Sequence, residues 1–413
     1  MASSDDRTDQ NWANLIKWLC EHGMSEDLAV GCRFFADSGR GLAATKDVEA
    51  NKPLFTIPKS CLLNADMLHK WAKKHSVTHL SSVQLLTCYL ALYKAQGEEL
   101  DASPYTPYLQ SLPFDFDFHP LSWLVNNNQR MVEKLAEETK YKLIKVQDRF
   151  KQDKQAVSNQ FPALSTGDIL WAWLNVNTRS LYYGCKRSRS HQDHITMCPL
   201  LDFANHSLGA TNFNTSEFRR AGHPIPTMIA PKNGLRSEEQ VYLLYGFHSN
   251  QTLFVEYGFT VSISPPELSI DSRVVTRFEK TEGGAEKRAL LEARGYWGDW
   301  TLHADPTPAH PSYRLIPALR LLHVSLQDQS ALQRWEATVN GELDEISPQN
   351  SERMRNTLKE MCLELQEEAA AHLSPLDALI EEGISMASIQ QLWLEQHDIC
   401  TAIVQNITDG IEL

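Results

Sequence analysis

Two segments of the chain hold side chains that could bind a polar ligand and position a reacting nitrogen. CPLLDFANHS places Asn205 and His206 directly after a short apolar run, and LLYGFHSNQTLFVEYGF contains two Tyr-Gly steps, at Tyr245 and Tyr257. An amide and an imidazole can bond the polar edge of a ligand, and polar groups inside an apolar run cost stability unless they find partners. Tyrosine hydroxyls at the end of a buried strand could position an amine. A satisfied buried network, or packing of the tyrosines, explains the same residues without a ligand.

A glycine-rich turn, SGRGLAA, begins at Ser38. Glycines let the backbone approach a ligand closely and adopt positive φ. The N–H groups of such a turn can hold a carboxylate or the amino-acid part of a nucleotide-like cofactor. An ordinary turn remains the alternative. The same holds for NVNTRS, where Arg179 can be a surface cation at a helix C-terminus, favoured there by the helix dipole.

Hydrophobic periodicity predicts the elements that must position these residues. Alternating β-rich runs predict strands over residues 30–36, 41–44, 53–57, 227–229, 241–245 and 260–263. Apolar positions at helical spacing predict helices over residues 11–21, 80–99, 131–157, 165–180, 318–326, 351–373 and 389–408. The helix over 165–180 opens on a Ser/Thr-x-x-Asp sequence that resembles a capping box. Ser-Pro-Pro at 264–266 predicts a domain boundary.

Composition restricts the class of protein and its partners. The chain has 413 residues, enough for two or three domains, with 42% hydrophobic and 22% charged residues. No apolar run is long enough to predict a membrane span, and the polar N-terminus argues against a leader sequence. A net charge of −13 disfavours direct contact with nucleic acid and favours a basic partner, although many soluble proteins are acidic for solubility alone.

The eight cysteines are spread along the chain without CxxC spacing. Structural zinc needs closely paired thiolates or imidazoles, so we predict reduced, mostly packed thiols and no metal. His191 and His194, near Cys185 and Cys198, could be combined into a metal site, but a polar loop is the simpler interpretation. Reduced thiols predict a cytoplasmic protein, which the sequence leaves open to nuclear entry as well.

In their order along the chain, SGRGLAA, NVNTRS, LLDFANHS and the doubled Tyr-Gly resemble the SET domain of protein-lysine methyltransferases. The resemblance is to the split-SET class, similar to the plant Rubisco large-subunit methyltransferase. It implies an α+β fold in which the SET β-fold is interrupted by an all-helical insert and followed by a mostly helical C-terminal domain that helps to bind protein substrate. The implied parts are an N-terminal helix (1–24), the first SET segment (25–64), the insert (65–164), the second SET segment (165–263) and the C-terminal domain (264–413).

The resemblance also implies roles for individual residues. Tyr245 would be catalytic, and it would line the substrate pocket together with Tyr257 and Phe259. S-adenosylmethionine would be the cofactor, with Arg179 bonding its carboxylate bidentately. The implied cofactor-binding residues are Ser38, Gly39, Arg40, Gly41, Leu42, Arg179, Asp202, Asn205, His206 and Tyr257.

The implied activity is methylation of lysine in a non-histone protein, for example one of the translation machinery. A protein-histidine methyltransferase of the same fold is the first alternative, but the two tyrosines favour lysine because the histidine-modifying relative has a small residue at the second position. The other alternative is a catalytically idle adaptor that holds a basic partner. One departure concerns the turn before the strand that carries Tyr245, where Ser237 and Glu238 replace the family's glycine, and Gly234 is left to make the turn.

Overall fold

The computed structural model describes residues 4–96, 103–186, 190, 193–210, 219–220, 223–224, 226–376 and 384–411. The chain divides into two compact units. The first unit comprises Met1–Phe116 and Asp148–Phe247, and the second comprises Asp117–Gln147 and His248–Leu413. The five-part division that the resemblance implies stays a prediction.

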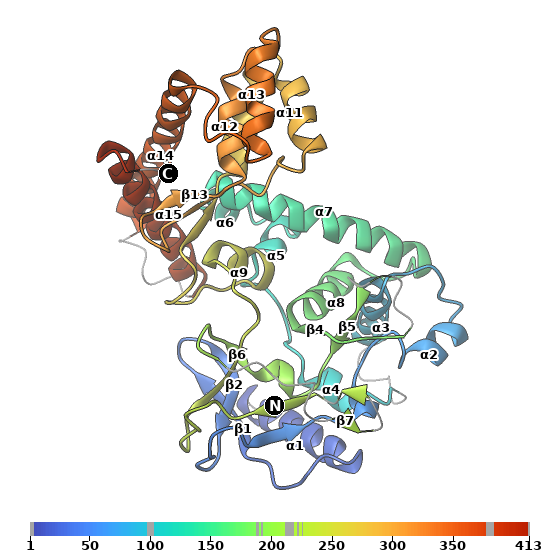
Figure 1. Ribbon diagram of the computed structural model, residues 1–413. Coiled ribbons are helices and arrows are strands. Elements are labelled where there is room, and N and C mark those ends of the chain that lie inside the picture. The colour runs from blue at the N-terminus through green and yellow to red at the C-terminus, as the bar shows by residue number, and fades with distance from the viewer. Residues whose placement is uncertain are drawn as a thin grey trace. The chain divides into compact units, whose positions relative to one another are not determined.

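A four-stranded sheet in the first unit brings together the glycine-rich turn, the Asn-His pair and the strand before Tyr245 (Figure 1). Its order is β1 (Val30–Phe35), β2 (Gly39–Ala44), β10 (Gln240–Leu243) and β6 (Asn205–His206). β1 and β2 form an antiparallel hairpin, β10 runs antiparallel to β2, and β6 runs parallel to β10. The glycine-rich turn and the Asn-His pair are therefore both neighbours of the strand that precedes Tyr245.

Shorter strand pairs complete the β structure described in the first unit. They are β3 (Pro53–Thr56) with β9 (Thr227–Ile229), β4 (Ser180–Tyr182) with β5 (Ile195–Met197), and β7 (Arg219–Arg220) with β8 (His223–Pro224). The strands predicted at 30–36, 41–44, 53–57, 227–229 and 241–245 are confirmed, with ends that differ by one or two residues. Pairs as short as β4 with β5 contain too few residues to show an alternating pattern.

Helices of the first unit support this sheet. They are α1 (Ser4–Glu21), η1 (Lys59–Cys61), α2 (His69–Lys74), α3 (Ser82–Gln96), α4 (Thr106–Ser111), α8 (Thr166–Arg179) and η4 (Leu201–Phe203). α3 packs against α8, and α1 packs against α4. The predicted start of α8 is confirmed, because the Ser165 hydroxyl accepts a hydrogen bond from the backbone N–H of Asp168 at 3.1 Å. Arg179 is the last residue of this helix.

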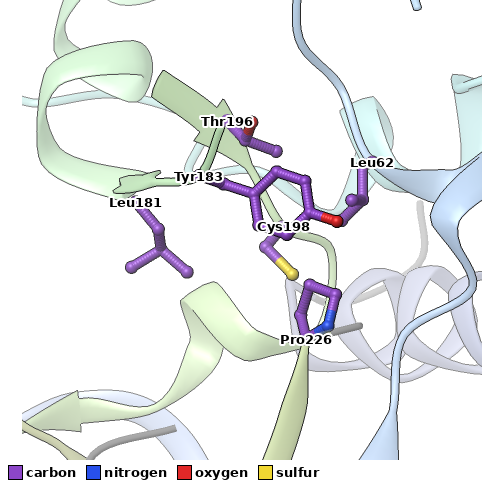
Figure 2. A pocket seen from close by; sticks show the side chains of 6 residues that line it. All are labelled: Leu62, Leu181, Tyr183, Thr196, Cys198 and Pro226. Atoms are coloured by element: carbon purple, nitrogen blue, oxygen red, sulfur yellow. The ribbon is translucent and has the colours of Figure 1, made fainter. Parts of the chain in front are cut away.

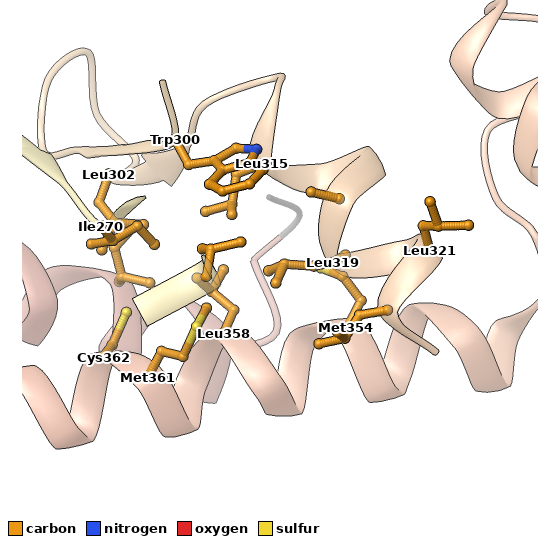
Figure 3. Close-up of a cluster of buried hydrophobic side chains, with 14 of the residues drawn as sticks. Ile270, Trp300, Leu302, Leu315, Leu319, Leu321, Met354, Leu358, Met361 and Cys362 are labelled. Atoms are coloured by element: carbon orange, nitrogen blue, oxygen red, sulfur yellow. The ribbon is translucent and has the colours of Figure 1, made fainter. Parts of the chain in front are cut away.

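The second unit is mostly helical, as predicted for the C-terminal part of the chain. Its helices are α5 (Pro120–Val125), α6 (Gln129–Glu133), the first half of α7 (Glu137–Gln160), α9 (Asn250–Tyr257), α10 (Asp271–Glu279), α11 (Gly284–Ala293), α12 (Leu315–Leu322), α13 (Gln329–Val339), α14 (Pro348–Leu376) and α15 (Ile384–Thr408). One face of α14 presents Met354, Leu358 and Met361 to Trp300 and Leu319 (Figure 3). These side chains are almost completely buried and form the core of the unit.

Two predictions for the second unit are wrong. Residues 260–263 form no strand, because the Asn250 side chain bonds both the N–H (2.7 Å) and the carbonyl (2.8 Å) of Val261 in place of a strand partner. Tyr257 lies at the end of helix α9 and not of a strand, and Gly258 ends that helix with a φ of 86°. The sequence pattern also missed a small sheet of β11 (Glu267–Ser269), β12 (Thr301–His303) and β13 (His310–Pro311).

Within the described residues, no helix combines the length and the apolarity that crossing a membrane requires. All eight cysteines are free thiols, and six of them are buried.

Candidate active site

The candidate site begins where Gly41 meets Asn205. A methyl group built on Gly41 would lie 2.6 Å from Asn205 Nδ2 and 3.1 Å from Gln240 Nε2, so only glycine allows these amides to approach β2. Gly39 has a φ of 70°, which turns the chain from β1 into β2. Exposed Ser38 accepts a hydrogen bond from Gln240 Nε2 at 3.1 Å. The glycine-rich segment is therefore a tight hairpin held against the Asn-His strand.

Asn205 leaves a buried donor at this contact. Its side-chain nitrogen is shielded from solvent and has no hydrogen-bond partner among the described residues. A buried amide without a partner costs about 1–3 kcal/mol. Such a group in a native protein calls for an explanation, and a ligand that accepts its hydrogen bond would supply one.

Two arginines and one aspartate surround the same region. Arg179 Nη1 donates to the backbone carbonyl of Asp202 at 2.9 Å and lies 3.7 Å from its carboxylate. Arg40 Nη2 donates to the backbone carbonyl of Ser111 at 2.6 Å, and its guanidinium lies 4.4 Å from the centre of the Phe203 ring. Burial, with the neighbouring Arg179 charge, lowers the pKa of Arg40 to about 10. Two positive charges therefore face a single carboxylate.

Asp202 is buried and held mainly by a tyrosine. Tyr108 OH donates to its Oδ2 at 2.8 Å, while Oδ1 has no hydrogen-bond partner in the described structure. Burial raises the pKa of Asp202, opposed by the Arg179 charge and by the Tyr108 hydrogen bond. Tyr108 has no exposed surface, and burial raises the pKa of its hydroxyl well above the ordinary value. Tyr108 is thus a neutral donor to a largely desolvated carboxylate.

These groups fit the carboxylate of an amino-acid-like ligand. Asn205 Nδ2 and Arg179 Nε are both buried donors without partners in the described part of the chain. The excess positive charge of Arg40 and Arg179 over Asp202 would be neutralised by one bound anion. Both donor chemistry and charge therefore match a single carboxylate.

Tyr245 lies directly beside the Asn-His pair. Tyr242 and Leu243 pair with Asn205 and His206 in the parallel β10–β6 ladder, and the chain reaches Tyr245 two residues later. The Tyr245 N–H donates to His206 Nδ1 at 3.1 Å, and the ring centres of the two residues are 5.2 Å apart. The Tyr245 hydroxyl donates to the carbonyl of Ala204 at 2.9 Å. Because the hydroxyl proton points to that carbonyl, the lone pairs of the hydroxyl oxygen can accept a hydrogen bond from an amine.

A tight turn precedes β10, although Ser237 and Glu238 stand where the resemblance leads us to expect glycine. Gly234 has a φ of 72°, and a methyl group there would lie 2.6 Å from the carbonyl of Val48, so this position requires glycine. Glu238 also adopts a left-handed conformation, with a φ of 69°, and its carboxylate is 2.6 Å from the Arg33 guanidinium. Gly234 and Glu238 together lead the chain into β10.

No family model matches the chain, but individual known proteins do. The chain is 25% identical over 405 residues to the ribosomal lysine N-methyltransferase set11 of Schizosaccharomyces pombe, covering 96% of this chain and 98% of that protein. It is 26% identical to human SET domain-containing protein 4, covering 95% and 90%. The crystal structure of the SET domain of LSMT bound to lysine and AdoHcy covers 99% of this chain and 92% of that one, with a TM-score of 0.67 and 18% identity.

The chain has the SET fold and is similar to SET-domain proteins over nearly its whole length. The predicted fold class, α+β with an interrupted SET β-fold, is confirmed by this likeness over nearly the whole chain. Within the first unit, the structure brings together all the predicted site residues except Tyr257 and Phe259. They are Ser38, Gly39, Arg40, Gly41, Leu42, Arg179, Asp202, Asn205, His206 and Tyr245.

Tyr257 and Phe259 belong to the second unit. Their rings are 6.0 Å apart, and burial raises the pKa of Tyr257. Their predicted place beside Tyr245 in a substrate pocket stays a prediction.

Cys198, which opens the Asn-His segment, is a packing residue. Its thiol lies among Leu62, Tyr183 and Pro226 (Figure 2), in a space too small for a water molecule. Burial raises the pKa of this thiol well above the ordinary value, which makes it a poor nucleophile or metal ligand. Among the described residues, no three His, Cys, Asp or Glu side chains are grouped to hold a metal. His191 lies outside the described residues.

Sequence reasoning missed Tyr108 and Gln240. Gln240 could have been suspected, because it begins the strand that leads to Tyr245. Tyr108 lies 94 residues before Asp202, in a segment rich in proline and aromatic residues. The sequence contains no signal that pairs these two residues.

Proposed function

We propose that this protein is an S-adenosylmethionine-dependent protein-lysine N-methyltransferase. The observation that carries the proposal is the joining of two features by one strand. β10 pairs with the strand of Asn205 and leads to Tyr245, while Asn205 Nδ2 and Arg179 Nε are buried donors without a partner among the described residues. Support comes from the relatives, since a protein named as a ribosomal lysine N-methyltransferase matches the chain almost from end to end.

The residues present suggest how the site would work. When bound, S-adenosylmethionine would supply a methyl group whose bond to the sulfonium sulfur breaks as its bond to a nitrogen forms, with S-adenosylhomocysteine as the leaving group. A lysine amine has a pKa of about 10.4 in water and must lose its proton before it can attack. A dry, aromatic passage would favour the neutral amine by desolvation. Tyr245, with its proton committed to the carbonyl of Ala204, would accept a hydrogen bond from that amine and direct its lone pair.

Histidine methylation is the second candidate. The chain is 26% identical over 274 residues to the actin-histidine N-methyltransferase of Danio rerio, which covers 60% of this chain and 42% of that protein. The lysine-directed relative is matched over 98% of its length, and this favours lysine.

We further propose that the substrate is a basic, non-histone protein, consistent with the net charge of −13. The eight free thiols support a cytoplasmic location.

The test incubates the full-length chain with S-adenosylmethionine carrying a labelled methyl group and with proteins from cells that lack this enzyme. Mass spectrometry then identifies the labelled residue. Label on lysine, absent with Tyr245→Phe, supports the proposal. Label on histidine selects the second candidate. Failure to bind S-adenosylhomocysteine and to label any fraction, including ribosomes, overturns both.

A further inference from the structure

We call Asn205, Arg40, Arg179 and Asp202 the cofactor cradle. The helical segment α4 contacts both of its arginines, Arg40 directly and Arg179 through Asp202. Its last residue, Ser111, accepts the hydrogen bond of Arg40 through its backbone carbonyl. Tyr108, one turn earlier, donates to the carboxylate of Asp202, which neighbours Arg179. The Ser111 hydroxyl donates back to the carbonyl of Tyr108 at 2.6 Å, which ties the two positions together. α4 is therefore placed to control where both positive charges lie.

The contact between Arg179 and Asp202 is looser than a full ion pair. The nearest carboxylate oxygen is 3.7 Å from Nη1, whereas a charge-assisted N–H···O bond is about 2.8 Å long. The guanidinium bonds the backbone carbonyl of Asp202 instead, and its Nε has no partner among the described residues. The oxygen that would close the pair, Oδ2, is the one that accepts the Tyr108 hydroxyl.

We propose that Tyr108 is a positioning residue that prevents the Asp202 carboxylate from forming a direct ion pair with Arg179. Arg179 then stays available for the carboxylate of the cofactor, and this role rests on the function proposed above. Without the hydroxyl, a buried carboxylate loses its hydrogen bond and is drawn to the nearest cation. Arg179 would then be neutralised inside the protein. Binding would suffer only for ligands that carry a carboxylate.

Two ligands separate this role from general support of the fold. S-adenosylhomocysteine carries the amino-acid carboxylate, whereas 5′-methylthioadenosine keeps the adenosine and the thioether but lacks the amino-acid part. Tyr108→Phe should weaken S-adenosylhomocysteine binding about tenfold in calorimetry, and it should change 5′-methylthioadenosine binding by less than about twofold. Tyr105→Phe is the matched control, because it removes another buried hydroxyl, at the start of α4, that bonds Leu62 and not Asp202.

The double variant Tyr108→Phe/Asp202→Asn provides the second arm. It removes the carboxylate charge that would otherwise be left unpartnered, while the backbone carbonyl that holds Arg179 stays. Selectivity for S-adenosylhomocysteine should return to within about threefold of wild type, and this can be measured even if Tyr108→Phe alone does not fold.

The outcomes are distinct. Equal loss for both ligands in Tyr108→Phe, unchanged binding of both, or no recovery in the double variant overturns the role of Tyr108. Wild-type protein that binds neither ligand refutes the proposed function itself.

Discussion

Replacing Gly41 by alanine tests the cofactor cradle at its tightest contact. The new methyl group would lie 2.6 Å from Asn205 Nδ2, whereas ordinary contact begins at 3.4 Å. Asn205 Nδ2 must therefore retreat by about 0.8 Å. The hydrogen bond that we propose between this nitrogen and the cofactor carboxylate, about 2.9 Å long, would then exceed the length limit of a hydrogen bond. A hydrogen bond to a charged acceptor contributes about 1.5–3 kcal/mol. The dissociation constant for S-adenosylhomocysteine should rise about 10- to 150-fold.

Titration calorimetry measures this change, and two further variants identify its cause. Gly31→Ala adds a methyl group to the same hairpin, in contact with Thr45 and away from the cradle, and should leave affinity unchanged. If Gly41→Ala acts by displacing the amide, then combining it with Asn205→Ala should cost no more than Asn205→Ala alone. Wild-type affinity in folded Gly41→Ala protein, or fully additive losses in the double variant, would refute this account of the cradle.

Three further predictions concern chemistry and stability. Tyr245→Phe should lower kcat about 10²-fold or more and leave S-adenosylhomocysteine affinity within about twofold; equal turnover would remove Tyr245 from catalysis. Burial lowers the pKa of His119 from 6.5 to about 4. Between about pH 6.5 and 4, only the unfolded state therefore binds a proton at this residue. The second unit should lose up to about 3 kcal/mol of stability as the pH falls through this range. In urea unfolding, His119→Asn, which can still cap α5, should flatten that dependence, and an unchanged slope would contradict the assignment. Gly258→Ala, at a φ of 86° and with its methyl group 2.9 Å from the Phe118 ring, should destabilise the same unit by about 1–3 kcal/mol in that assay, whereas no measurable loss would show that the helix end can relax.

The sequence predicted those elements of the fold whose pattern is local. The first three strands and helix α8 alternate or repeat clearly, and α8 also carries its own capping serine. Residues 260–263 read as a strand by composition, but a strand needs a partner for its backbone. Asn250 takes both main-chain groups of Val261, and no periodicity in the sequence encodes that competition.

The candidate site divides along the same line between local and distant information. Asn205, His206 and Tyr245 could be named because motifs place polar residues next to apolar runs. The separation of Arg179 from Asp202 could not be predicted, because it depends on the Tyr108 hydroxyl, which only the fold places beside Asp202. The charge balance of the cradle is likewise a property of the fold, since it requires the relative positions of Arg40, Arg179 and Asp202.

The register of the short strand β10 determines whether these parts make one site. On one side, Gln240 and Val241 pair with the strand that contains Gly41; on the other, Tyr242 and Leu243 pair with Asn205 and His206. Because side chains alternate along a strand, a slip of one residue would turn each of them to the opposite face. Tyr245 would then lose its bond to the His206 ring, and Asn205 would no longer face Gly41. Gly234 and Glu238, both left-handed just before β10, form the turn through which the chain enters that strand in this register.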